Sequence, residues 1–264
     1  MQFLNTGRRY QTIVLTILIL VLCVSAWCQT FEEILGNFAQ RRSGVCVLYA
    51  HAMAIAAADP ATFSKLVFES YSGAWSVKLN GKRWAYVSRE EVDKSIKAGF
   101  SAGEPNNILT VFSIAVSKTV GGFNYETGEL DYGDGWMKYV GTGNWTLYDN
   151  EQGPGKSLKD GLDRLAREVK PDGTPSCPST MGFGSLDEKT IPDYIDGVRK
   201  AKLVGGHDFM VDKYDAENRI VFLRNPHNPK ELLEAPVDLL LNIPAGIDFM
   251  EPHPAPTEQT ASSK

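Results

Sequence analysis

Residues 47–58 read VLYAHAMAIAAA, and this stretch decides the fold. It is rich in alanine, contains neither glycine nor proline, and is apolar on nearly every side. Alanine is the strongest helix former, and a helix that is apolar all round is buried by its neighbours on every side. The stretch therefore predicts a central buried helix that ends at Asp59-Pro60, with His51 facing the core.

The rest of the chain carries weaker patterns around this helix. Further helices are expected over residues 90–98, 107–120, 157–170 and 191–203. Alternating apolar residues predict two β-hairpins, one over residues 74–88 around Asn80-Gly81 and one that pairs residues 208–212 with 219–224. Loops are expected over residues 121–149 and 171–184. Helices come first and strands last, so the sequence predicts an α+β chain with a helical N-terminal lobe and a β-rich C-terminal lobe.

The first 28 residues have the order of a secretory signal peptide. Arg8 and Arg9 precede an almost wholly apolar run, and small residues follow at residues 24–26. We predict a signal peptide over residues 1–28, with a retained N-terminal anchor as the alternative, and therefore a secreted or periplasmic protein. The folded domain is expected over residues 31–245. Residues 251–264, rich in proline, serine, threonine and alanine, are expected to form a disordered tail.

The charge balance excludes some classes of partner. Without Arg8 and Arg9, 25 of the 27 basic residues remain against 32 acidic ones, which gives a net charge of −7. No basic stripe indicates nucleic-acid binding. Contact with a membrane is expected only if the N-terminal segment is retained. The chain is long enough for one sizeable core, and we expect a monomer.

Cysteine is scarce, and Cys46 and Cys177 are the two that lie outside the predicted signal peptide. Two cysteines do not make a disulfide scaffold, although a single Cys46–Cys177 bridge is the plain alternative to a reactive thiol. Together with the histidines they form no zinc-binding spacing. We therefore expect neither a metal nor a cofactor.

Cys46 is a candidate nucleophile because it stands where the central helix begins. The exposed amides and the dipole of a helix N-terminus lower the pKa of a thiol, and a nearby histidine completes its activation. His207 is a candidate for that histidine, since it begins a predicted strand behind Gly205-Gly206. Asp208, the next residue, is expected to point to the other face of the strand.

Asn225 and Gln40 supply the two remaining functions of such a site. Antiparallel pairing of the second hairpin brings its ends together, so Asn225 can lie beside His207 and orient the ring. Gln40 precedes the central helix, and its amide with the Cys46 N–H can form a two-donor oxyanion hole. Loss of one such donor typically costs on the order of 3 kcal/mol of transition-state stabilisation.

In this order the residues resemble the papain-like cysteine peptidases, and within them the calpain catalytic core. That family places its nucleophile in a Gln-x-x-x-Gly-x-Cys frame, its base in Gly-His-x-Tyr/Phe and its third member in Arg-Asn-Pro. This chain has Gln40…Gly44-Val45-Cys46, Gly206-His207-Asp208-Phe209 and Arg224-Asn225-Pro226. The similarity in order and overall spacing covers residues 36 to about 243.

The resemblance implies a two-lobed fold with a cleft between the lobes and a set of catalytic residues. Gln40 would be the oxyanion donor, Cys46 the nucleophile, His207 the general base and then acid, and Asn225 the residue that orients His207. The implied activity is that of a cysteine endopeptidase that hydrolyses protein or peptide substrates through an acyl-enzyme intermediate. The chain departs from the family where Val47 follows the cysteine and His227 follows Asn-Pro, both in place of tryptophan.

Each residue also has a plainer interpretation, and two other functions remain open. Cys46 taken alone is typical of a small buried apolar residue, and His227 taken alone of an exposed loop. A transglutaminase-type acyltransferase also uses a cysteine and a histidine, although it normally has aspartate where this chain has Asn225. An inactive relative that binds peptides or proteins in the same cleft is the other alternative.

Overall fold

The computed structural model describes residues 29–41, 44–80, 83–102, 104–132, 135–141, 143–150 and 155–251. The predicted signal peptide, residues 1–28, and residues 252–264 of the predicted tail lie outside these ranges. Glu251 is the last residue of a strand, so the folded part continues beyond residue 245 and Glu251 does not belong to a tail. Within the described ranges, no helix has the length and apolar character needed to span a membrane.

Most of the predicted helices are present. The α-helices are α2 (Phe31–Leu35), α3 (Cys46–Ala58), α4 (Pro60–Ser64), α5 (Arg89–Lys97), α6 (Ile108–Thr119), α7 (Leu158–Arg167), α8 (Ile195–Lys200) and α9 (Val237–Leu240). Short 3₁₀ helices lie at Trp136–Tyr139 and Pro192–Tyr194. Capping boxes fix the starts of α5 and α7, where the side chains of Ser88 and Ser157 accept a hydrogen bond from a first-turn N–H. The helix predicted over residues 191–203 is shorter than expected.

The strands form three antiparallel sheets, so the protein is an α+β protein. The largest sheet has six strands in the order β10-β9-β8-β7-β11-β6. These strands are β6 (Asn144–Asp149), β7 (Ser179–Phe183), β8 (His207–Asp215), β9 (Ile220–Arg224), β10 (Leu232–Pro236) and β11 (Ala245–Glu251). The smaller sheets comprise β2 (Val67–Glu69), β3 (Trp75–Lys78) and β4 (Trp84–Val87), and the pair β1 (Ala39–Gln40) and β5 (Ser101–Ala102).

Both predicted hairpins are confirmed, whereas the two predicted long loops are wrong. β3 pairs with β4, and β8 with β9, in antiparallel register. Residues 121–149 end in β6, and residues 171–184 contain β7, which lies inside the six-stranded sheet between β8 and β11. β7 reads STMGF and contains a glycine, which is depleted in strands and weakens the local pattern. The strand forms because its neighbours pair with it on both edges.

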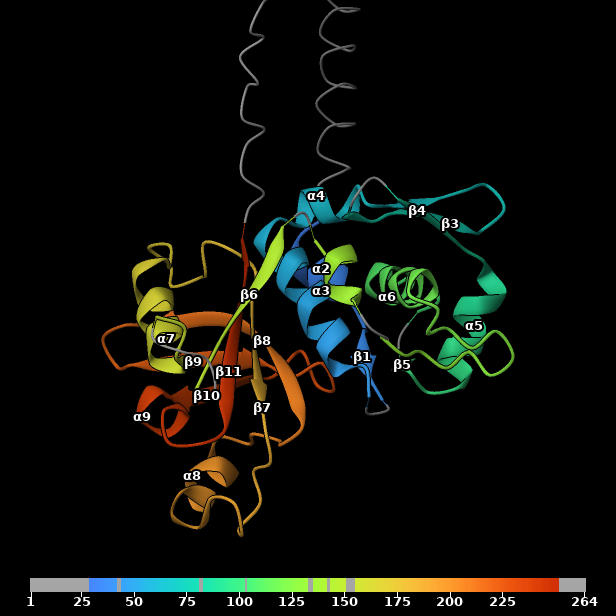
Figure 1. The fold of residues 1–264 in the computed structure, drawn as a ribbon. Coiled ribbons are helices and arrows are strands. Elements are labelled where there is room, and N and C mark those ends of the chain that lie inside the picture. Colours follow the sequence, from blue (N-terminus) through green and yellow to red (C-terminus); the bar gives the residue numbers. More distant parts are fainter. Residues whose placement is uncertain are drawn as a thin grey trace, which may run out of the picture.

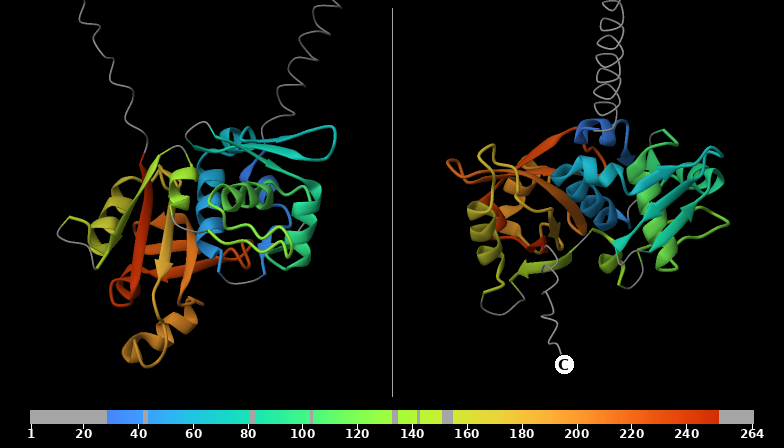
Figure 2. Two further views of the ribbon diagram at one scale, coloured as in Figure 1. Left: turned by 45° about the vertical axis from the view of Figure 1, so that its right-hand side comes forward. Right: turned by 90° about the horizontal axis from the view of Figure 1, so that it is seen from above.

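The core consists of two hydrophobic clusters with α3 at their junction. One cluster joins α2 to α6 with the three-stranded sheet, and the other joins the six-stranded sheet with α7, α8 and α9. Figure 1 shows α3, in blue, between the six-stranded sheet and α6, and the views in Figure 2 agree with this arrangement. α3 is buried on nearly all sides, from Cys46 to Ala56, as its composition predicts. The position of α3 brings its first residue next to the start of β8, an inner strand of the six-stranded sheet.

His51 ties α3 to that sheet, and its predicted core position is confirmed. The ring is fully buried, its Nδ1 donates to the Val47 carbonyl at 2.7 Å, and its Nε2 lies 3.2 Å from the Thr180 hydroxyl in β7. Because the carbonyl can only accept, Nδ1 carries the proton and Nε2 accepts from Thr180. Burial lowers the pKa of His51 to about 3, so the ring is neutral.

Candidate active site

Cys46 lies at the N-terminus of α3, as the sequence predicts. Gly44 has φ of +106°, a backbone conformation that favours glycine, and this turns the chain into the helix. Val45 is the N-cap residue and makes no side-chain capping bond, so no cap side chain competes for the first amides of the helix. Cys46 and Cys177 are both free thiols, and the alternative of a bridge between them is not formed.

The side chain that contacts the thiol is Asp208 and not His207. The Cys46 Sγ lies 3.9 Å from Asp208 Oδ2, and no hydrogen bond joins Cys46 to His207 within the described part of the chain. Asp208 does point to the strand face opposite His207, but Cys46 lies on that face. Burial raises the pKa of the Cys46 thiol above its usual value. The Asp208 carboxylate adds to this rise, while the N–H groups of Asp208, Val47 and Cys46 oppose it.

His207 and Asn225 form the pair that the hairpin predicts. The His207 Nε2 lies 2.8 Å from Asn225 Oδ1, and the same oxygen accepts the backbone N–H of His227 at 2.9 Å. Since Oδ1 accepts the His227 N–H, the amide orientation is assigned and Nε2 of His207 must carry the proton. The lone pair of His207 is then on Nδ1, which has no hydrogen-bond partner among the described residues.

Burial keeps His207 in its neutral form. The residue is only 5 % exposed, and this burial lowers the pKa of its imidazole below the ordinary value. The hydrogen bond to Asn225 opposes the shift, and the nearby His227 adds to it. A neutral imidazole with its lone pair on Nδ1 can accept a proton, which is the requirement for a general base.

The loop that carries Asn225 is held by Arg224, the residue before it. Arg224 ends β9, donates to the Pro229 carbonyl at 2.8 Å and forms ion pairs with Asp212 and Glu32. Glu32 belongs to α2, so this side chain also links the two hydrophobic clusters. The arginine of the Arg-Asn-Pro motif therefore has a structural function, since it fixes the position from which Asn225 reaches His207.

His227 lies against His207, and the prediction of an exposed loop histidine is wrong. The two imidazole rings are stacked with centroids 4.9 Å apart and an interplanar angle of 22°. The Nδ1 of His227 donates to the Gln40 carbonyl at 2.8 Å, and the Gln40 N–H donates to the Pro226 carbonyl at 2.8 Å. An imidazole thus covers one face of the His207 ring, which shields the His207–Asn225 bond from water.

Gln40 is brought to the same place through its main chain. It ends β1, is only 2 % exposed, and is attached to Pro226 and His227 by the two bonds described above. Its backbone therefore bonds to the residue that directly follows Asn225, although 185 positions separate Gln40 from Asn225 in the sequence. The structure gathers Gln40, His207 and Asn225 around one loop, with Cys46 next to the residue that follows His207.

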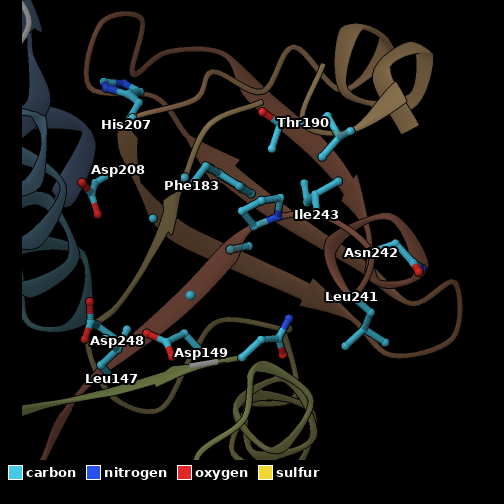
Figure 3. A pocket seen from close by; sticks show the side chains of 18 residues that line it. Leu147, Asp149, Phe183, Thr190, His207, Asp208, Leu241, Asn242, Ile243 and Asp248 are labelled. Carbon is cyan, nitrogen blue, oxygen red and sulfur yellow. The ribbon is translucent and has the colours of Figure 1, made fainter. Parts of the chain in front are cut away.

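A cavity of about 840 Å³ opens beside this group. Its lining comes from the six-stranded sheet and the loops next to it, and it includes His207 and Asp208. Figure 3 shows those two residues on the side nearest to α3, with Thr190, Leu241 and Ile243 on the other side. Two further acidic residues, Asp149 and Asp248, lie at its lower edge in this view. The cavity therefore begins at the candidate base.

Sequence reasoning missed these carboxyl groups as site residues. Asp149 ends the stretch 121–149 that was predicted to be a loop, and the sequence places Asp208 only on the strand face opposite His207. Burial raises the pKa of Asp208 to about 6, with the Cys46 hydrogen bond opposing the rise. Burial, with the Asp208 and Asp149 carboxylates, raises the pKa of Asp248 to about 7. No local pattern reveals them, because they approach one another only through strand pairing.

Neither the protein-family models nor the curated proteins compared with this sequence include a match to it. The interpretation of the site therefore depends on its own geometry. A buried thiol at a helix N-terminus, a neutral histidine oriented by an asparagine, and an adjoining cavity can support nucleophilic attack on a carbonyl group.

Proposed function

We propose that this protein is a cysteine endopeptidase of the papain-like type, with its catalytic site between the two hydrophobic clusters. The observation that carries the proposal is the bond from the His207 Nε2 to Asn225 Oδ1, which leaves a lone pair on Nδ1 of a neutral imidazole. The free thiol of Cys46 at the start of α3 supports it. The order Cys, His, Asn is the order that the sequence resemblance implies.

In the proposed mechanism the His207 Nδ1 takes the proton from the Cys46 thiol, and the thiolate attacks the carbonyl carbon of a peptide bond. The resulting oxyanion is stabilised by the Cys46 N–H and the Gln40 side-chain amide. His207 then gives its proton to the departing amine, which leaves an acyl-enzyme. Water attacks the thioester with His207 as base, and the acid product leaves as the thiolate is reprotonated.

The first step requires the thiol to exchange partners. In this structure the Cys46 Sγ hydrogen-bonds Asp208, so the bond at 3.9 Å must give way before Nδ1 of His207 can accept the proton. The raised pKa of Cys46 indicates that the resting thiol is protonated. Bound substrate would bring about this exchange, since a peptide in the cavity lies against Asp208.

The contact between the Cys46 thiol and Asp208 favours one other function. A thiol whose pKa is raised and whose partner is a carboxylate suits a catalytically inactive relative that binds peptides in the same cavity. The two functions differ in the reactivity of Cys46, which can be measured directly. An acyltransferase of the transglutaminase type is a weaker candidate, because Asn225 and not an aspartate orients His207.

Alkylation with iodoacetamide separates these functions. The purified protein is labelled over a range of pH, the rate is measured, and the modified residue is mapped by mass spectrometry. An endopeptidase should be labelled at Cys46 faster than at Cys177, with a pH dependence that disappears in His207→Ala. Equal slow labelling of both thiols would contradict the proposal. Casein digestion, with Cys46→Ala as the control, then separates hydrolysis from amine incorporation into glutamine.

A further inference from the structure

The cavity beside Cys46 has an acidic floor that is built by four strands. In the register of the six-stranded sheet, Asp208 pairs with Gly182, Gly182 with Gly246, and Gly246 with Asp149. These four residues form one row, so their side-chain positions share a face of the sheet. Asp248 is two residues beyond Gly246 on β11 and therefore lies on the same face. Three aspartates thus surround two glycines in the centre of the floor.

The two glycines leave room for the side chains that lie over this floor. A Cβ atom at Gly182 would lie 2.7 Å from Asp208 Oδ1, and one at Gly246 would lie 3.0 Å from Leu147 Cδ1 and 3.2 Å from Asp149 Cβ. A larger residue at either position would therefore displace the side chains that border the cavity. We call this part of the cavity the acidic hollow, defined by Asp149, Asp208 and Asp248 above Gly182 and Gly246.

Asp248 is a buried acid without a cationic partner in the part of the chain that the structure describes. It is only 8 % exposed, and its Oδ1 has no hydrogen-bond partner among the described residues. Its Oδ2 lies 4.0 Å from Nε2 of His51, but this ring is neutral and its Nε2 accepts from Thr180. Burial of a carboxyl group is unfavourable unless it is paired. The side chain lines the cavity, and Figure 3 shows it on the same side as Asp149 and Asp208.

The other walls of the cavity suit a long aliphatic group. Lysine and arginine are absent from the lining among the described residues, and no described lysine or arginine forms an ion pair with Asp208 or Asp248. Away from the carboxyl groups the lining is mostly apolar, with Ile191, Leu241 and Ile243. A lysine or arginine side chain has the matching form, because it carries a cationic end on an apolar stem.

A metal ion matches the hollow less well. Asp208 and Asp149 lie on strands that are three positions apart, and neighbouring strands are separated by about 4.8 Å, so their backbones are roughly 14 Å apart. Oxygen ligands bind Ca²⁺ or Mg²⁺ at about 2.0–2.6 Å. Consistent with this, the described residues contain no cluster of three or more histidine, cysteine or acidic groups that could hold a metal. A larger cation with several donors can reach more than one of the carboxylates.

We propose that the acidic hollow binds a lysine or arginine side chain of the peptide substrate, close to the bond that is cleaved. This inference rests on the proposed endopeptidase function, since Asp208 contacts both the hollow and the Cys46 thiol. It adds a substrate class to that function. Binding would also affect Cys46, because a cation beside Asp208 offsets the negative charge that adds to the effect of burial in raising the pKa of the thiol.

The test compares arginine with citrulline, which has nearly the same shape but no charge. Hexapeptides with one arginine at each position in turn, and the matched citrulline peptides, are titrated into Cys46→Ala by calorimetry. We expect the best arginine peptide to bind about tenfold to a hundredfold more tightly than its citrulline partner, as for a lost hydrogen bond to a charged group. In Cys46→Ala/Asp248→Asn this preference should fall to about twofold or less.

Two control variants distinguish the loss of the Asp248 charge from the removal of any surface acid and from the filling of the cavity. Cys46→Ala/Asp93→Asn removes an acid from the exposed surface of α5 and should keep the arginine preference. Cys46→Ala/Gly246→Ala fills the floor without changing the charge, so both peptides should bind more weakly. Equal binding of arginine and citrulline peptides to Cys46→Ala would show that the proposal is wrong. Binding of free agmatine without binding of arginine peptides would also overturn it, since the occupant would then be a small amine.

The same peptides distinguish this proposal from the proposed function. If the wild-type protein cleaves no peptide while Cys46→Ala prefers arginine, the endopeptidase function fails and the acidic hollow stands as a cation site. If the wild type cleaves arginine and citrulline peptides with equal kcat/KM, the endopeptidase function stands and the acidic hollow fails as its specificity site.

Discussion

The two sides of the candidate site differ in how fully their polar groups are paired. On the base side, His207, Asn225 and His227 are joined by hydrogen bonds and ring stacking, and the loop that holds them is anchored by Arg224. On the thiol side, Cys46 contacts a carboxyl group of raised pKa, and no described lysine or arginine forms an ion pair with Asp248. His207 is thus already oriented in this structure, whereas on the thiol side the carboxyl groups would be paired only by the cationic ligand proposed above.

Removal of the base should give the largest effect. In the proposed mechanism His207→Ala deletes the group that accepts the thiol proton, and general bases typically contribute about 10²- to 10⁴-fold to the rate. We expect kcat/KM for a peptide substrate to fall within that range, and the thermal midpoint to fall by a few degrees because the bond to Asn225 and the stacking on His227 are lost. Retention of more than a tenth of the wild-type activity would assign the base function to another residue, and Asp208 would be the first to examine.

The unpaired carboxyl group on the thiol side should reduce stability at neutral pH. The pKa of Asp248 rises from 3.8 to about 7 on folding. Below about pH 3 it is protonated in both states and has no effect. As the pH rises from about 3 through 7, the unfolded chain ionises first, so the folded state loses stability. Asp248→Asn should therefore increase the free energy of unfolding by on the order of 4 kcal/mol at pH 8 and by less than about 1 kcal/mol at pH 4.

Urea denaturation of both proteins at these two pH values measures this difference. Asp93→Asn serves as the matched control, because its carboxyl group is exposed and should change stability little at either pH. An equal effect of Asp248→Asn at pH 4 and pH 8 would indicate a packing change and not a titration.

Removal of the carboxylate beside the thiol should make Cys46 more reactive. Asp208→Asn deletes the negative charge that contributes to the raised pKa of Cys46, while burial and the backbone N–H groups remain. The pH at which alkylation is half-maximal should move down, and labelling at pH 7 should be several-fold faster. A slower rate in Asp208→Asn would instead mean that Asp208 is the base for this thiol.

The smallest effect is expected where an imidazole covers His207. His227→Ala removes the ring that stacks on His207, along with its bond to the Gln40 carbonyl. We expect a loss of about 1 kcal/mol of stability, as for one hydrogen bond. The pKa of His207 should rise, because its burial decreases and the influence of His227 disappears. The acid limb of the pH profile of kcat/KM should therefore move to higher pH.

His227→Trp provides the comparison for this variant. It restores a covering ring without a second imidazole, so the stacking contact should be kept while the electrostatic influence on His207 is lost. A pH profile for His227→Trp that matches His227→Ala would show that shielding by the ring has no part in setting the pKa.

Local sequence patterns determined α3, the position of Cys46 at its start, and the hairpin that brings His207 to Asn225. Each depends on residues that are close in sequence: an alanine-rich apolar stretch, a glycine before the cysteine, and alternation on both sides of a short turn. These features could be predicted because they need only helix propensity, backbone freedom and antiparallel pairing.

Only the tertiary structure decided which side chain contacts the thiol and what surrounds it. The row Asp208–Gly182–Gly246–Asp149 draws its members from four strands, two of which lie in or at the end of stretches with the composition of loops. Turn geometry fixes the register within a hairpin, but the register between strands that are distant in sequence depends on which faces they bury in the folded protein. For this reason the sequence identified a cysteine, a histidine and an asparagine, while the acidic hollow beside them emerged from the fold.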